Sequence, residues 1–253
     1  MIAFGLFGLL FGSFVTVLVH RLPRKESVVG PRSQCPHCGI LIRAVDNVPL
    51  VSYLLLRGRC RNCGERISPE YPITEVATAL LFAGAAWAIR PLYAAAIVAP
   101  FLGVMLAVAL IDVRWRIVPN RLTYPALLVF LVVIVAGHIA GEGVDAVRGL
   151  LGLALYAGPL FVLALALPAG MGMGDVKLAA LIGLVLGSLG LAYVAVAAFA
   201  GVIGGGVGAV LAMAAMGYGR KQHIPFGPFL AAGAVVAALA APQIARLYLS
   251  LLG

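Results

Sequence analysis

Long apolar runs follow one another along most of this chain, and they restrict it to folds that sit in a lipid bilayer. A helix needs roughly 20 apolar residues to cross the hydrocarbon core, so the sequence predicts about eight transmembrane helices. We place them at about residues 1–19, 72–90, 93–111, 122–140, 147–168, 177–190, 191–217 and 227–250. Charged residues make up only 11% of the chain, against about 25% in a soluble domain. The expected fold class is therefore an all-α polytopic membrane protein.

One long polar segment, residues 20–71, interrupts these runs and carries all four cysteines. They form two Cys-x-x-Cys pairs about twenty residues apart, Cys35 with Cys38 and Cys60 with Cys63. This spacing is typical of a structural zinc site in which four thiolates complete the tetrahedron. The alternatives are a four-thiolate iron site, two unrelated thiol pairs, and a redox switch. We expect three parts: a first transmembrane helix at 1–19, a cytoplasmic zinc-knuckle domain at 20–71, and a membrane domain with about seven helices at 72–253.

The net charge of +9 is divided unevenly between the two sides of the predicted membrane fold. All of the 18 lysines and arginines except Arg90, Arg148 and Arg246 fall on the side that carries the polar segment. Cytoplasmic loops hold the excess of basic residues in membrane proteins, so this side is predicted to be cytoplasmic. The sequence contains no nucleic-acid recognition module. We therefore expect the lipid bilayer, and not nucleic acid, to be the partner of this charge.

Two aspartates stand out in the strongly apolar stretch after residue 75. Asp112 ends one apolar run, and Asp175 follows the glycine-rich loop Gly170-Met-Gly-Met-Gly. Both are predicted on the cytoplasmic side at the edge of the bilayer, where an ionisable group is costly and points to a functional site. Two carboxylates on one side suggest an acid/base pair. The alternatives are an interfacial ion pair beside an ordinary turn, a proton-coupled transporter with an aspartate relay, and a zinc-dependent scaffold without catalysis.

Other polar or flexible residues are predicted near the same side. Gly172 and Gly174 permit backbone geometries closed to other residues and let another chain approach the loop closely. Asn120, which follows a proline, is expected to start the fourth helix. Glu75 falls in the first turn of the second predicted helix, where an acid either favours the helix N-terminus or belongs to the site. His20 lies near the same face without a motif partner.

Ordered motifs run nearly from end to end of the chain. They are Gly12-Ser13-Phe14 with Arg21-Leu-Pro23, the cysteine pairs with Asp46-Asn-Val-Pro-Leu-Val-Ser-Tyr, Ile111-Asp112 with Pro119-Asn120-Arg-Leu-Thr123, Gly172-Met-Gly-Asp175-Val-Lys177, and Ile224-Pro-Phe-Gly-Pro228. With these motifs the chain resembles the type IV prepilin peptidases, the bifunctional leader peptidase/N-methyltransferases. The Gly-x-Gly-Asp signature is shared with presenilin-like intramembrane aspartyl proteases. The chain departs from the family in one place, because Thr16 stands where many members carry asparagine.

The resemblance implies an aspartyl endopeptidase of the bacterial cytoplasmic (inner) membrane, with its catalytic side facing the cytoplasm. Its substrates would be type IV prepilins or pseudopilins, which lose a basic leader at the membrane boundary and are then N-methylated from S-adenosylmethionine. The implied catalytic residues are Asp112 and Asp175, and the implied supporting residues are Gly172, Gly174, Lys177 and Asn120. The position of the S-adenosylmethionine pocket does not follow from the sequence.

Overall fold

The structure is a computed structural model, and it describes residues 1–166, 172–216 and 225–252. Within these residues the chain forms α-helices, one 3-10 helix and two isolated β-bridges, with no strand. The elements are α1 (Ile2–Arg21), η1 (Ala44–Asp46), α2 (Val51–Leu55), α3 (Glu70–Ala88), α4 (Leu92–Trp115), α5 (Asn120–Ile139), α6 (Ala146–Ala166), α7 (Met173–Leu189), α8 (Leu191–Met216) and α9 (Gly227–Leu252). The long helices correspond in order to the predicted spans.

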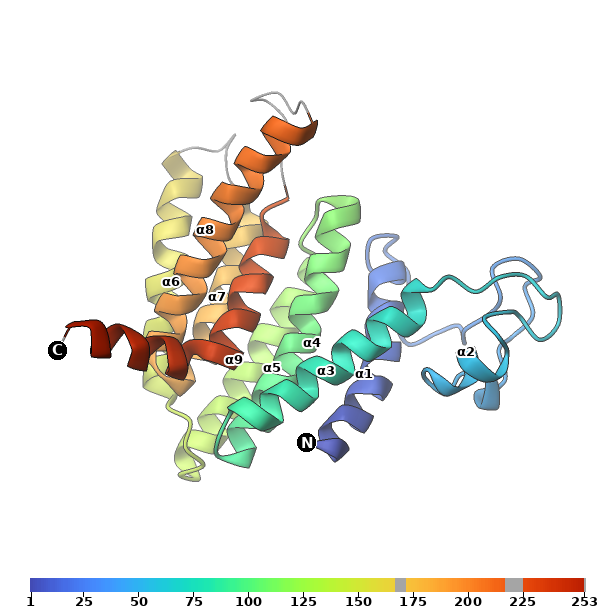
Figure 1. Cartoon of the computed structure of the whole chain (residues 1–253), viewed down its shortest axis with the longest axis horizontal. Helices are drawn as coiled ribbons and strands as arrows, with labels where there is room; N and C mark the ends of the chain where they lie inside the picture. The colour runs from blue at the N-terminus through green and yellow to red at the C-terminus, as the bar shows by residue number, and fades with distance from the viewer. Residues whose placement is uncertain (167–171, 217–224, 253) are drawn as a thin grey trace.

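The long helices run alternately in opposite directions and form one bundle (Figure 1). In the described part of the chain, five stretches are apolar and long enough to cross a membrane on length and composition alone: α1, α4, α5, α6 and Leu191–Gly208 of α8. α7 has 17 residues, and α3 carries two glutamates near its start. The prediction of an all-α polytopic membrane protein is confirmed.

α4 is the central helix of the bundle. In its most apolar stretch 72% of the residues are buried, against 22–33% in the other four candidate spans. It packs against α1, α3, α5, α7 and α9. The outer helices leave apolar side chains such as Leu128 and Val132 exposed, as a surface in contact with lipid requires. α4 is therefore the rigid element against which a site at its end is held.

Small residues allow α6 and α7 to approach closely. A Cβ added at Gly152 would overlap the backbone of Gly183 and would lie 2.9 Å from the Cα of Gly187. Helix pairs in membranes use such small residues because lipid provides no hydrophobic force to bring helices together. This contact fixes the position of α7, whose first turn carries Asp175.

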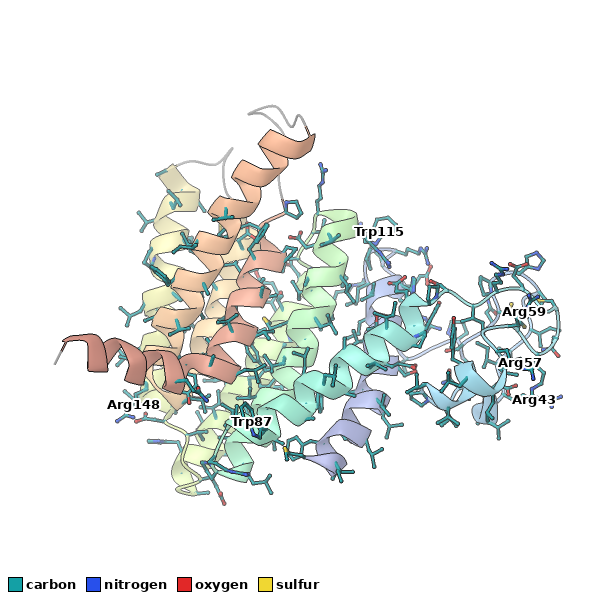
Figure 2. The ribbon with its side chains drawn as sticks, in the orientation of Figure 1. Arg43, Arg57, Arg59, Trp87, Trp115 and Arg148 are labelled. Carbon is teal, nitrogen blue, oxygen red and sulfur yellow. The ribbon has the colours of Figure 1, made fainter. Side chains whose placement is uncertain are left out.

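Two exposed tryptophans lie at opposite ends of the bundle (Figure 2). Trp87 is at the end that also carries Arg148, and Trp115 is at the other end. Tryptophan is enriched at both membrane–water interfaces. The two side chains are therefore placed as interfacial anchors for a bundle that crosses a bilayer.

The polar insert, residues 22–69, connects α1 to α3 and contains η1 and α2. It projects from the side of the bundle formed by α1 and α3, away from α6 and α8 (Figure 1). Its surface carries several arginines, among them Arg43, Arg57 and Arg59 (Figure 2). The insert lies next to the helices that it joins and forms a separate small unit around the cysteines.

Candidate functional site

Asp112 and Asp175 lie on two helix ends that meet at the same end of the bundle. The sequence predicted both aspartates at span ends, just outside the spans 93–111 and 177–190, whereas the structure places each of them inside a helix. Asp112 is in the last turn of α4, because the helix continues to Trp115 and ends where Arg116 adopts a left-handed conformation (φ 53°, ψ 42°). Asp175 is in the first turn of α7, where the helix N-terminus favours a negative charge. α4 and α7 are in contact, so the two aspartates lie on neighbouring helices at the same end of the bundle (Figure 1).

Asp112 is held by the beginning of α9. Its side chain is buried, and the backbone N–H of Gly227 donates a hydrogen bond of 3.0 Å to its Oδ2. A Cβ at residue 227 would lie 2.6 Å from that oxygen, so only glycine fits without displacing the carboxylate. This contact joins residues 115 positions apart. Gly227 belongs to the Ile224-Pro-Phe-Gly-Pro228 motif, which is recognisable in the sequence, although the sequence assigns no role to it. Ile224 itself lies outside the described residues.

The start of α7 packs on the connection between α4 and α5. A Cβ at Gly174 would lie 3.0 Å from the Cβ of Val118, so the close approach needs a small residue. Lys177 Nζ donates a hydrogen bond of 2.7 Å to Asn120 Oδ1, and it lies 5.2 Å from the centre of the Tyr124 ring. The first two turns of α7 are therefore held against the α4–α5 connection and the first two turns of α5.

The predicted supporting residues surround Asp175. Gly172 is the N-cap of α7 with extended backbone angles, and its carbonyl accepts the N–H of Asp175 at 3.1 Å. Gly174, Asn120 and Lys177 make the contacts described above. The structure thus brings all four together beside the aspartate pair, whereas Gly170 of the same loop lies outside the described residues.

The four cysteines form one compact cluster in the insert. Their sulfur atoms all lie within 4.8 Å of one another, with 3.9 Å between Cys35 Sγ and Cys63 Sγ, and none is in a disulfide. A tetrahedral zinc ion with Zn–S bonds of about 2.3 Å sets its sulfurs roughly 3.8 Å apart. The spacing therefore fits one four-thiolate metal ion without a position for a further ligand.

The two halves of the cysteine cluster have the same backbone geometry. Cys35 N–H donates to Ile40 O and Cys60 N–H donates to Glu65 O, at 2.9 and 2.8 Å. Each hairpin turns at a glycine with positive φ, which L-residues rarely adopt. The backbone amides of Cys63 and Asn62 lower the pKa of the Cys60 thiol to about 7. At Cys63 the lowering effect of the Glu65 amide is outweighed by desolvation and the neighbouring thiols, which raise the pKa of that thiol. One thiolate therefore forms readily, and a cation is needed to hold the others in the ionised form that binds a metal.

Polar contacts connect α3 and the insert to the end of the bundle that carries the aspartates. Arg114, two residues after Asp112, forms an ion pair with Glu70 at the start of α3. Arg121 donates a hydrogen bond of 3.0 Å to the carbonyl of Lys25. Within the insert, Arg61 forms a bidentate ion pair with Asp46 and holds the pKa of that carboxyl below its usual value.

Comparison with known proteins gives one consistent family. The model of the bacterial peptidase A24 N-terminal domain matches residues 6–89, and the model of the type IV leader peptidase family matches residues 99–210. The chain is 36% identical to the prepilin leader peptidase/N-methyltransferase of Bacillus subtilis (97% of this chain, 96% of the relative). The protein of the same description from Aeromonas hydrophila is 34% identical over 97% of this chain and 92% of the relative. That from Pseudomonas aeruginosa is 35% identical over 98% of this chain and 93% of the relative. No solved structure matches the chain.

Proposed function

We propose that this chain, which belongs to the type IV leader peptidase family, removes the basic leader of type IV prepilins or pseudopilins and N-methylates the new terminus. The observation that supports cleavage most strongly is the meeting of Asp112 and Asp175 at two helix ends on one side of the bundle. No serine or cysteine nucleophile is needed, because a carboxylate pair can activate water directly.

The chemistry follows from the two carboxyl groups. Two close carboxylates share one proton, since both do not ionise easily side by side. The ionised group takes a proton from water, and the protonated group donates a hydrogen bond to the carbonyl oxygen of the scissile peptide. Attack of the water gives a tetrahedral intermediate. Its collapse transfers a proton to the leaving amine and restores the shared proton. Asp112 is fixed by Gly227, and the position of Asp175 is fixed by the contacts of α7.

The site suits a substrate that is half in water and half in lipid. A prepilin presents a basic leader followed by an apolar helix, and a site at the helix ends of a membrane bundle meets the junction between the two. We place this end in the cytoplasm and the protein in the bacterial inner membrane, because nearly all the lysines and arginines fall on this side in the sequence. The transporter alternative is disfavoured because relay acids lie near the bilayer midplane, whereas both aspartates are at helix ends.

We propose that Cys35, Cys38, Cys60 and Cys63 bind one structural zinc ion. An ion held by four thiolates has no open position for water or substrate, so its role is to stabilise a small insert with few apolar residues. Losing the metal should therefore affect the aspartate chemistry only indirectly, through the position of the insert.

A reconstitution with pure components tests the proposal. The full-length protein in detergent is mixed with a purified prepilin and S-adenosylmethionine, and the product is examined by mass spectrometry. The expected product has lost its leader and gained one methyl group on the new N-terminal nitrogen. Two controls are needed: the enzyme must be folded, and a related peptidase must cleave the same prepilin. If both hold and the prepilin still remains uncleaved, the proposal is contradicted.

A further inference from the structure

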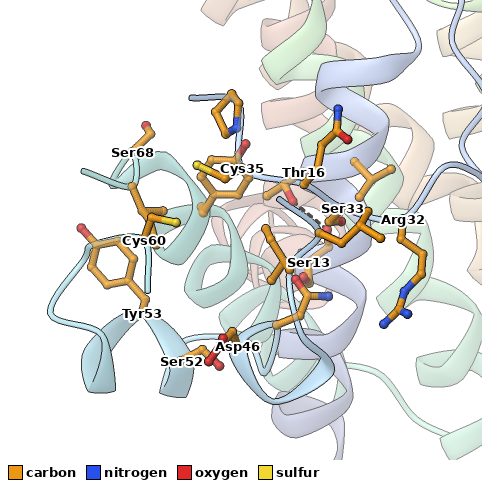
Figure 3. A pocket seen from close by; sticks show the side chains of 18 of the residues that line it. Ser13, Thr16, Arg32, Ser33, Cys35, Asp46, Ser52, Tyr53, Cys60 and Ser68 are labelled. Carbon is orange, nitrogen blue, oxygen red and sulfur yellow. Dashed lines mark hydrogen bonds between the residues drawn. The ribbon is translucent and has the colours of Figure 1, made fainter. Parts of the chain in front are cut away.

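A cavity of about 720 Å³ lies between α1, the start of α3 and the insert, and neither aspartate of the candidate site lines it. Its size is within the roughly 300–1,000 Å³ of sites that enclose small molecules. Figure 3 shows Ser13 and Thr16 of α1 on one wall, facing Ser33 and Cys35 of the insert. The cavity is therefore formed where the insert docks on the membrane helices.

One face of α1 forms the inner wall. Ser13, Thr16, Val17 and His20 line the cavity, and their spacing places them on the same side of a helix. Thr16 is buried and donates a hydrogen bond of 2.7 Å to the carbonyl of Ser13. The position at which the chain departs from its family thus lies on this wall.

His20 contains a buried polar atom that the described part of the protein leaves unpaired. Its Nε2 is inaccessible and has no hydrogen-bond partner there, while its ring stacks on Tyr71 with centroids 5.4 Å apart. Both rings line the cavity. Buried polar groups in proteins almost always have a partner, so this atom indicates a ligand or water at the wall.

Glu75 supplies the buried negative charge of the cavity. The residue is 7% exposed, and its Oε2 accepts the backbone N–H of Leu50 at 2.7 Å. The other acidic residues on the wall are either exposed, as Glu26 and Glu65 are, or paired, as Asp46 is with an arginine. A carboxylate accepts several hydrogen bonds, so Glu75 holds the insert and still offers an oxygen to a ligand.

We infer that this cavity binds S-adenosylmethionine and that Glu75 faces the reacting amine, an inference that rests on the proposed methylation. The donor carries a sulfonium cation, an adenine ring and an amino-acid carboxylate. The cavity offers each a counterpart: the carboxylate of Glu75, the stacked rings of His20 and Tyr71, and at the rim the guanidinium of Arg32. The residues present therefore fit the group.

The methyl transfer balances with one proton acceptor. The N-terminal ammonium of the cleaved pilin first gives one proton to Glu75, which leaves a lone pair on nitrogen. That lone pair attacks the methyl carbon, the nitrogen–carbon bond forms, and the carbon–sulfur bond breaks with its electron pair moving to sulfur. The positive charge moves from sulfur to the methylated nitrogen, and S-adenosylhomocysteine leaves as a neutral thioether.

Photolabelling locates the donor without measuring activity. The full-length protein in detergent is irradiated with radiolabelled S-adenosylmethionine, and the labelled peptides are identified by mass spectrometry. The expected label lies within residues 13–20, 48–53 or 71–75 and is displaced by S-adenosylhomocysteine. Displaceable label confined to α7, α8 or α9 would overturn the inference.

Two substitutions test the wall by equilibrium binding and by the ratio of methyl transfer to cleavage. Glu75→Gln removes the charge but keeps an oxygen for the Leu50 amide, and Val17→Phe fills the cavity without adding polarity. Each variant should weaken donor binding at least about tenfold. Glu75→Gln loses one charge-assisted contact, and Val17→Phe loses the space that the donor occupies. Glu142→Gln, an exposed position in the connection after α5, is the matched control and should resemble the wild type.

The outcomes separate the site from the function. Unchanged binding and transfer in both variants would exclude this cavity while leaving methylation intact. Metal content and cleavage are measured on the same samples. If Glu75→Gln has lost its metal, that variant is set aside and Val17→Phe decides alone. Donor binding by Val17→Phe at the wild-type affinity then excludes the cavity. Wild-type protein that cleaves but transfers no label would instead refute the proposed methylation.

Discussion

Replacing Gly227 by alanine should disable cleavage while leaving the bundle folded. The added Cβ would lie 2.6 Å from Asp112 Oδ2 and 3.2 Å from its Cγ. Ordinary contacts at such a position begin at 3.4 Å, so the oxygen or the start of α9 must move by 0.8 Å, the difference between 3.4 and 2.6 Å. The hydrogen bond of 3.0 Å from the Gly227 amide is distorted by the same movement.

The size of the effect follows from two independent considerations. A hydrogen bond to a charged group contributes about 1.5–3 kcal/mol, and each 1.4 kcal/mol corresponds to about tenfold in rate. A misplacement of about 1 Å in a catalytic site costs on the order of 100-fold. We therefore expect Gly227→Ala to lower kcat/KM for prepilin cleavage by about 10- to 100-fold.

A matched control separates this effect from a general glycine effect. Gly206 is a helical glycine in α8 at which an added Cβ meets nothing within 4 Å, so Gly206→Ala should cleave at the wild-type rate. Both variants are compared with wild type in detergent, with monodispersity and melting temperature as checks of folding. If Gly227→Ala cleaves within twofold of wild type, the contact with Asp112 does not position the carboxylate.

Three further predictions concern the metal, the α7 contact and helix packing. Cys60→Ser should lose the metal that elemental analysis detects in the reduced wild-type protein, and its insert should become sensitive to protease, since zinc binding to such sites contributes about 10–16 kcal/mol. A reduced wild-type protein that contains no metal and still has a protease-resistant insert would contradict this prediction. Asn120→Leu, which removes the acceptor of Lys177, should slow cleavage about fivefold, whereas Asn120→Asp should not; equal rates for the two would refute the contact. Gly152→Leu should lower stability by about 1–3 kcal/mol or more through overpacking, whereas Gly158→Leu in the same helix, with open space around it, should keep the wild-type melting temperature.

The fold was predictable because a lipid environment leaves few choices. Every backbone polar group inside the bilayer must be paired within the protein, and a run of about 20 apolar residues meets this requirement by forming a helix. The residues at which the helices end were less predictable. Asp112 was expected just after a helix and lies within its last turn, because the helix end is set by the left-handed Arg116. Such an end depends on backbone geometry that an apolar pattern does not encode.

The contacts within the candidate site depend on packing between distant segments. Asp112 and Asp175 were paired from their shared side, but the hydrogen bond to Asp112 comes from Gly227, 115 residues away, and the motif around Gly227 does not indicate which residue it contacts. The same holds for the cavity, which forms where the insert packs on α1 and α3 and the Leu50 amide contacts Glu75. The sequence placed Glu75 at a helix start or at a site; the structure buries it beneath the insert.

The most direct test of the central proposal is cleavage of a prepilin by the two single aspartate variants. Asp112→Asn and Asp175→Asn keep the shape of each side chain but remove its ability to hold or take a proton. Each purified variant should leave the prepilin intact, while it still transfers a methyl group to pilin supplied already cleaved, which shows that it is folded. Cleavage at the wild-type rate by either variant would remove that aspartate from the mechanism and contradict the proposed carboxylate pair.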